Sequence, residues 1–87
     1  MNFYTVILRQ SQEYWVSLCL ENGLVGQGTT QEQAIDKLQE AIASFEEVER
    51  SEPNVYSAPI PIRELHEFLT IEDQEATEIY ELRKVYA

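Results

Sequence analysis

The fold of this chain is decided by residues 13–48, which read EYWVSLCLENGLVGQGTTQEQAIDKLQEAIASFEEV. A strand pattern ends in a tight turn, a short second strand reaches Gly26-Gln27-Gly28, and an amphipathic helix with threonine caps follows. This order joins an apolar sheet face to a helix that can cover it. Because the stretch holds no recognisable motif for a nucleophile, a metal cluster or a phosphate loop, it is typical of a binding module.

Strands are predicted on both sides of the polar residues 10–12, and the two should form a hairpin. In the first, residues 3–9, alternation places Tyr4, Val6 and Leu8 on one face and Phe3, Thr5 and Ile7 on the other. In the second, residues 14–20, one face carries Tyr14, Val16, Leu18 and Leu20, and the other carries Trp15, Ser17 and Cys19. Both faces of the predicted sheet are therefore rich in large apolar side chains.

A third, short strand is predicted to begin at Leu24-Val25, after a reversal at Glu21-Asn22-Gly23 where Asn and Gly accept positive φ easily. One long helix can cover only one face of this sheet. We expect the face with Phe3, Ile7 and Trp15 to be covered in one of two ways: by the chain's own C-terminal segment or by a second subunit.

The long helix is predicted to start at Thr29 or Thr30, because each has a capping-box partner three residues later, Glu32 or Gln33. Spacings of three and four then produce one apolar stripe, made of Ala34, Ile35, Leu38, Ala41, Ile42, Phe45 and Val48. The opposite face is mostly acidic and carries Asp36, Lys37, Glu40, Glu46, Glu47 and Glu49. We expect the stripe to pack on the sheet and the acidic face to meet solvent or a partner.

The C-terminal part should complete a single domain of residues 1–87. Three prolines within residues 53–61 end the helix, and residues 52–76 form a connection with a short helix at 63–69. Residues 77–86 fit a helix or a strand, and we predict a strand because Tyr, Ile and Val are concentrated there. The predicted class is α+β, with three or four antiparallel strands and one long helix packed across them, in the order β-β-β-α-(α)-β.

Charge and composition narrow the range of partners. The 87 residues carry a formal net charge of −10, and only Glu13 and Glu21 of the 16 acidic residues precede residue 32. Such a field repels phosphates, so we expect no direct binding of nucleic acid and favour a basic protein partner. Maintaining solubility is an equally good explanation of the charge. The single cysteine, Cys19, the lack of a secretory signal and the lack of ~20 consecutive apolar residues predict a cytoplasmic protein without a membrane span.

No pattern in the sequence points to catalysis. His66 is the only histidine and has no cysteine nearby, so a metal site would need scattered carboxylates. Gly26-Gln27-Gly28 before a helix is a weak signal for an anion cradle, because a turn and helix caps explain the same residues. We therefore expect no enzyme activity, no catalytic residue, no cofactor and no metal.

Residues 13–48 resemble the N-terminal domain of the HicB-like antitoxin family, whose members run hairpin, short third strand, G-x-T-x-E-E-A segment and amphipathic helix. The matching residues are Tyr14-Trp15-Val16, Gly26-Gln27-Gly28-Thr29-Thr30, Gln31-Glu32-Gln33-Ala34-Ile35 and residues 38–45. Where many relatives have an Asp-Leu-Pro-Gly turn, this chain has Glu21-Asn22-Gly23-Leu24-Val25. The DNA-binding module of longer members is not evident in residues 53–87.

The resemblance implies a partial ribonuclease H-like fold and an antitoxin of a toxin–antitoxin system, which neutralises a small basic HicA-type mRNA-cleaving toxin by protein–protein interaction. We also expect a homodimer. A basic partner should bind negative charge on the long helix, and the predicted partner-binding residues are Asp36, Glu40, Glu46, Glu47 and Glu49. The alternative is a stand-alone scaffold or regulatory binding protein of the same fold, with an unrelated partner.

Overall fold

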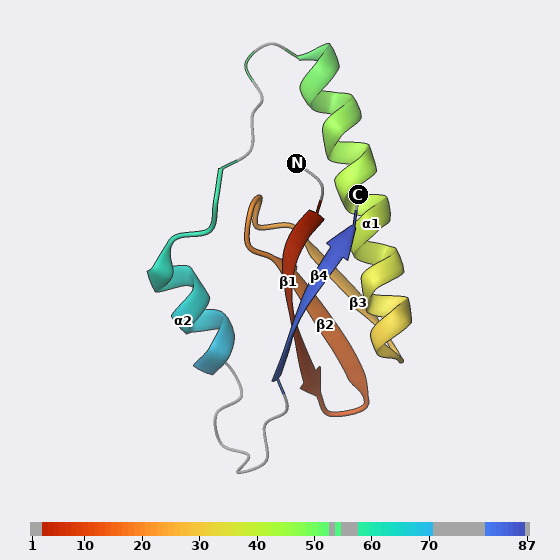
Figure 1. Ribbon diagram of the computed structural model, residues 1–87, viewed down its shortest axis with the longest axis vertical. Helices are drawn as coiled ribbons and strands as arrows, with labels where there is room; N and C mark the ends of the chain where they lie inside the picture. The colour runs from red at the N-terminus through yellow and green to blue at the C-terminus, as the bar shows by residue number, and fades with distance from the viewer. Residues whose placement is uncertain (1–2, 53, 55–57, 71–79, 87) are drawn as a thin grey trace.

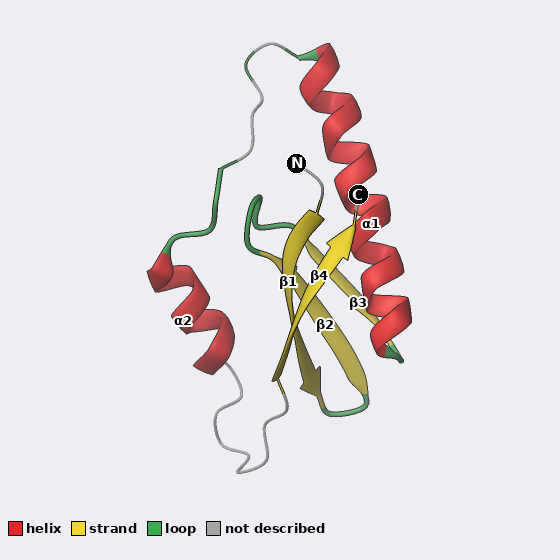
Figure 2. Cartoon of the chain, in the orientation of Figure 1, coloured by secondary structure: helices red, strands yellow, loops and turns green. Residues whose placement is uncertain are grey.

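The computed structural model describes residues 3–52, 54, 58–70 and 80–86, which form a sheet of four strands and two helices (Figures 1 and 2). In chain order the elements are β1 Phe3–Ser11, β2 Tyr14–Cys19, β3 Val25–Gly28, α1 Gln31–Ser51, α2 Ile62–Thr70 and β4 Tyr80–Tyr86. The α+β class and the order β-β-β-α-α-β are confirmed.

The strands lie in the order β3-β2-β1-β4, and every neighbouring pair is antiparallel. Figure 1 views this sheet from the edge formed by β4, the strand nearest the viewer, with α1 on one side and α2 on the other. The two helices thus lie on opposite sides of the sheet. The long helix α1 crosses the sheet over β2 and β3, because it follows β3 after a short turn.

The core lies between α1 and one face of the sheet. Three residues of the predicted apolar stripe, Ala34, Leu38 and Ile42, are buried there. From the strands they meet Val6, Leu8, Cys19 and Val85. Removing a side chain such as Leu38 from water is worth about 1.5 to 3 kcal/mol. Packing of α1 therefore holds strands from both ends of the chain in one sheet.

The hairpin between β1 and β2 is tighter than the sequence suggested. β1 continues through Gln10 and Ser11, so the loop contains only Gln12 and Glu13, and Ser11 is the Cα partner of Tyr14. Gln12 takes a φ of 57°, which lets the chain reverse in this short loop.

The short loop decides which face of β2 meets α1. The register pairs Leu8 with Ser17 and Val6 with Cys19, so Ser17 and Cys19 lie on the face that α1 covers. Trp15 packs against the same core. The predicted grouping of Trp15 with Phe3 and Ile7 is therefore wrong. Side chains alternate along a strand, so the longer predicted loop exchanged the two faces of β2.

The N-cap of α1 is Thr30, the second of the two threonines that the sequence offered. Its hydroxyl accepts a hydrogen bond of 3.0 Å from the Gln33 amide. The Gln33 side chain reaches back to Thr29, accepting from the Thr29 amide at 2.7 Å and from its hydroxyl at 3.0 Å. The helix continues to Ser51, past the predicted last apolar residue Val48, and ends shortly before Pro53.

Gly26 and Gly28 lie within β3, so the short strand predicted to reach them extends through both, and the chain bends only at Thr29 and Thr30. The role of the two glycines is close contact with α1. A Cβ atom on Gly26 would lie 2.4 Å from the Ala34 carbonyl oxygen and 2.4 Å from the Leu38 nitrogen. The Ser17 hydroxyl donates to the same Ala34 oxygen at 2.8 Å. Only a strand without side chains at these positions lets α1 approach so closely.

The C-terminal half contains the two remaining predicted elements, a short helix and a last strand. The predicted short helix is α2, and the choice of strand over helix is confirmed for β4, while residues 77–79 lie outside the described residues. Arg9 ties α2 to the second face of the sheet, because its Nη1 donates to the Phe68 carbonyl at 2.6 Å and its guanidinium lies 4.5 Å from the centre of the Phe68 ring. The chain's own C-terminal segment thus covers part of this face.

Candidate functional site

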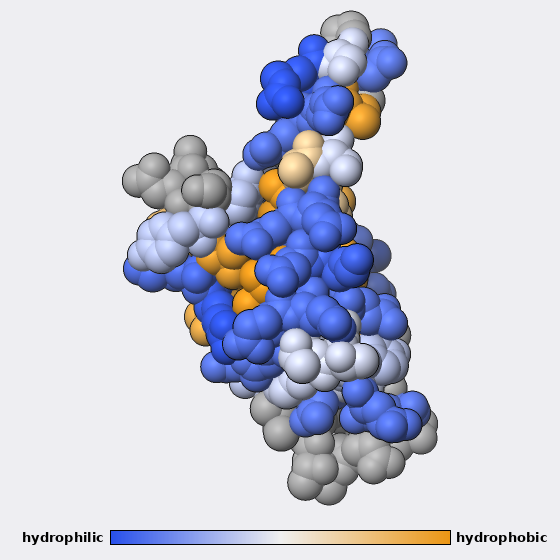
Figure 3. Space-filling view, turned by 90° about the vertical axis from the view of Figure 1, so that its right-hand side faces the viewer, coloured by the Kyte–Doolittle hydropathy of each residue, from blue (hydrophilic) through white to orange (hydrophobic). Residues whose placement is uncertain are grey.

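Two adjoining hollows lie where the second half of α1 passes the ends of three strands. They have volumes of about 220 and 200 Å³ and share Tyr4, Ile42 and Glu46. The first is completed by Glu21, Asn22, Phe45 and Glu49, and the second by Gln39, Ala43, Val85 and Tyr86. We call the pair the acidic groove. Figure 3 shows a band of apolar surface beside the mostly hydrophilic surface on this side of the molecule.

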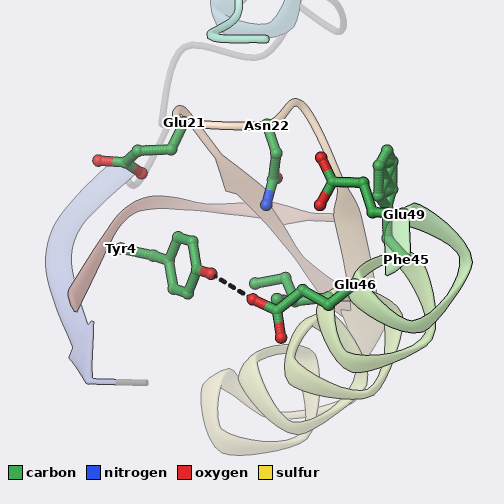
Figure 4. A pocket seen from close by; sticks show the side chains of 7 residues that line it. Tyr4, Glu21, Asn22, Phe45, Glu46 and Glu49 are labelled. Carbon is green, nitrogen blue, oxygen red and sulfur yellow. Dashed lines mark hydrogen bonds between the residues drawn. The ribbon is translucent and has the colours of Figure 1, made fainter. Parts of the chain in front are cut away.

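Tyr4 and Glu46 form the boundary between the hollows. The Tyr4 hydroxyl, from β1, donates a hydrogen bond of 2.9 Å to Oε2 of Glu46, from α1 (Figure 4). This bond and burial of the ring raise the pKa of Tyr4 above its ordinary value of 10.0. Tyr4 is therefore protonated at neutral pH, and it acts as a donor that orients the Glu46 carboxylate.

Glu21 forms another wall of the first hollow, just after β2. Oε1 accepts from the Thr5 amide and Oε2 from the Thr5 hydroxyl, each at 2.8 Å. Burial opposes ionisation of Glu21, but these hydrogen bonds outweigh it and the pKa of Glu21 lies below its ordinary value of 4.5. Figure 4 shows the Glu21 carboxylate directed away from Glu46 and Glu49. Its negative charge therefore lies at the edge of the hollow, apart from the two carboxylates of α1.

The turn after Glu21 positions Asn22 over the hollow. The Asn22 Oδ1 accepts from the Leu24 amide at 3.0 Å, and Gly23 takes a φ of 76°. The Gly23 amide donates to the Cys19 carbonyl at 2.8 Å, which closes the turn. In Figure 4 the Asn22 side chain extends toward the Glu46 and Glu49 side chains of α1. A polar side chain from the strand ends thus faces carboxylates from the helix.

Cys19 lies behind this wall and is fully buried in the core. Burial raises the pKa of its thiol, and the nearby Glu21 carboxylate adds to the shift. The Cys19 Sγ lies 3.6 Å from the Glu21 Oε1, to which it donates. Cys19 is thus a small side chain packed in the core, and a protonated, buried thiol is a poor nucleophile.

The structure divides the five predicted partner-binding residues into two sets. Glu46 and Glu49 line the acidic groove. Asp36, Glu40 and Glu47 are exposed and line neither hollow, and Glu40 lies 3.8 Å from Lys37 in an exposed ion pair. Sequence reasoning missed Tyr4, Glu21 and Asn22. The one signal for two of them was the difference between residues 21–25 and the turn of the HicB-like antitoxins that residues 13–48 resemble.

Other kinds of site find little support among the described residues. No group of three or more His, Cys, Asp and Glu residues there is arranged to hold a metal ion, and His66 is exposed on α2. Neither α1 nor α2 combines the length and the apolar character needed to cross a membrane. Comparison of the chain with protein-family models, curated proteins and solved structures gives no match.

Proposed function

We propose that this chain is a non-enzymatic binding protein whose acidic groove receives basic side chains of a small protein partner. The observation that carries the proposal is the meeting of Glu46 and Glu49 of α1 with the apolar residues Ile42 and Phe45 in one groove. An arginine or lysine has an apolar stem and a cationic head, so it matches both parts of this lining.

The charge of the surroundings supports the same class of partner. The chain carries a net charge of −10, and Asp36, Glu40 and Glu47 add exposed negative charge on another face of α1, outside the groove. A field of this sign accelerates association with a basic protein and repels nucleic acid. We infer that the groove binds the side chains of the partner while the outer face steers its approach.

Of the basic partners, a HicA-type toxin fits best, because residues 13–48 resemble the HicB-like antitoxins. The same resemblance leads us to propose a partial ribonuclease H-like topology for the sheet and α1. Binding a basic toxin through the surface that it uses for RNA neutralises it without chemistry, so an antitoxin needs no catalytic residue. The alternative is a regulatory scaffold of the same fold whose partner is harmless.

The test begins with the proteins that co-purify with the tagged full chain from its native host. Each recovered protein is expressed alone and together with the chain in growing cells. A small basic protein that arrests growth alone but not in the presence of the chain is the result expected for an antitoxin. A basic partner that never affects growth would support the regulatory scaffold instead.

A pair of matched variants tests the groove. Glu46→Arg with Glu49→Arg reverses the charge in the groove, whereas Asp36→Arg with Glu40→Arg makes the same change in charge on the exposed part of α1. We expect the groove variant to lose binding by about 100-fold, as for charge pairs at a close interface, and the control to slow association only. Equal effects of the two variants would show that charge alone, and not the groove, selects the partner.

A further inference from the structure

The β4 strand is the exposed edge of the sheet. It pairs with β1 on one side, and no described strand lies on its other side. Figure 1 looks onto this edge, and neither helix lies in front of it. Leu82, the third of the seven residues of β4, leaves 68% of its surface exposed. Such an edge offers backbone hydrogen-bonding groups and an apolar side chain to another strand.

The direction of the outward-facing groups follows from the register. The Thr5 carbonyl accepts from the Leu20 amide, so the backbone groups of Thr5 point toward β2. Those of its neighbour Val6 therefore point toward β4, where Val6 is the partner of Arg83. The backbone amide and carbonyl of Arg83 in turn point back toward β1. The amide and carbonyl groups of Leu82 and Lys84, the residues on either side, are directed outward.

The side chains along this edge are self-complementary. With a twofold axis at Leu82, two copies of β4 pair antiparallel, and Leu82 lies opposite Leu82 of the second copy. Glu81 then lies opposite Arg83 of the second copy, and by symmetry Arg83 lies opposite Glu81 of the second copy. These two residues already form a 3.6 Å ion pair within one chain, and their side chains are 44% and 34% exposed. Arg83 also donates to the Gln31 side chain of α1, and both charged side chains stay partly exposed, so they can form a second pair across the axis.

The two neighbouring registers bring like charges together. A twofold axis perpendicular to the sheet keeps each face of the sheet on the same side, so the register can shift only in steps that preserve side-chain alternation. Placing the axis at Arg83 sets Arg83 opposite itself. Placing it at Glu81 sets Glu81 opposite itself. Like charges directly opposite each other are destabilising, so the register centred on Leu82 is favoured.

We propose that two copies of this chain form a homodimer by antiparallel pairing of β4 with β4 across a twofold axis at Leu82. The outward backbone groups of Leu82 bond to those of Leu82 in the second copy. Glu81 and the second copy's Arg83 then form a non-hydrogen-bonded pair, which is the closer of the two kinds of antiparallel pair. Charged edge strands ordinarily discourage association, but here the charges match under twofold symmetry. Both α1 helices then lie on one side of a continuous sheet, and both acidic grooves open on that side.

The test uses Glu81→Arg and Arg83→Glu, each measured alone and then mixed, by sedimentation equilibrium of the full chain. Each single variant places like charges across the axis, and we expect its dimer to dissociate about tenfold more readily than the unchanged chain. Within either variant the chain's own ion pair is also lost, and Arg83→Glu further loses the hydrogen bond to Gln31, so this result alone does not separate the contacts within the chain from those across the axis.

The mixture separates them. When Glu81→Arg meets Arg83→Glu, every charge across the axis is again opposite, while each chain still has like charges within itself. We expect a heterodimer close to the original affinity. Far-ultraviolet circular dichroism checks that both variants are folded. An unchanged chain that is monomeric at millimolar concentration, or a mixture that associates no better than its components, would overturn the proposal.

Discussion

The hydroxyl of Tyr4 and the Oε2 atom of Glu46, which belong to residues 42 positions apart in the sequence, are joined by a hydrogen bond of 2.9 Å. This bond links the first strand to the second half of α1 at the acidic groove. Because the carboxylate holds the phenol proton, the pKa of Tyr4 is raised. The groove is thus coupled to the stability of the fold.

Replacing Tyr4 with Phe should lower the free energy of unfolding at pH 7 by about 0.5 to 1.5 kcal/mol, the usual worth of one hydrogen bond. A group whose pKa is raised on folding stabilises the fold below its unfolded pKa, and this contribution is lost as pH rises past 10.0 toward the folded pKa. Urea unfolding from pH 7 to 11 measures the effect. The difference between the two proteins should shrink in the alkaline range, and a constant difference would contradict the role of the bond.

Glu21 should show the opposite dependence on pH. Its pKa is lowered in the folded protein, so its contribution is present above the ordinary value of 4.5 and is lost as pH falls through the folded pKa. We expect carboxyl-carbon NMR to show Glu21 titrating below 4.5. Thr5→Val removes the hydroxyl donor but retains the amide, so it should raise the pKa of Glu21. A pKa of Glu21 that Thr5→Val leaves unchanged would contradict this role of the hydroxyl.

Gly26→Ala should be strongly destabilising. The new methyl group would lie 2.4 Å from backbone atoms of Ala34 and Leu38, and neither can rotate away. Displacing α1 should cost about 3 kcal/mol or more, at the upper end of overpacking. Gly23→Ala is the matched control, because a Cβ there meets no atom within 4 Å and only its φ of 76° opposes the change. That control should cost about 1 to 2 kcal/mol in thermal or urea unfolding.

Gln12→Gly should stabilise the protein. Gln12 holds a φ of 57° in the hairpin loop, which is unfavourable for a residue with a Cβ by about 1 to 2 kcal/mol. Glycine removes this strain, although the greater freedom of the unfolded chain offsets about 0.5 to 1 kcal/mol of the gain. The melting temperature should therefore rise. Glu13→Gly, at the neighbouring position without a positive φ, should lower it. A decrease for both variants would argue against this loop conformation.

The sequence by itself determined the elements and their order. Alternation predicted the strands, the spacing of Ala34, Leu38 and Ile42 predicted the buried side of α1, and the concentration of Tyr and Val predicted β4. These signals are local, because the period of a strand or helix is read from neighbouring residues. The acidic face of α1 was predicted in the same way, and it included Glu46 and Glu49.

Only the tertiary structure decided which face of β2 meets α1 and where the groove lies. Trp15 lies on the other face from the one predicted, because the register depends on the length and backbone angles of the loop at Gln12. A difference of one residue in the length of this loop exchanges the two faces of β2. The role of Gly26 depends on how closely α1 approaches, which no spacing in the sequence encodes. Tyr4, Asn22 and Glu46 meet because antiparallel pairing and the crossing of α1 bring the ends of separate segments together.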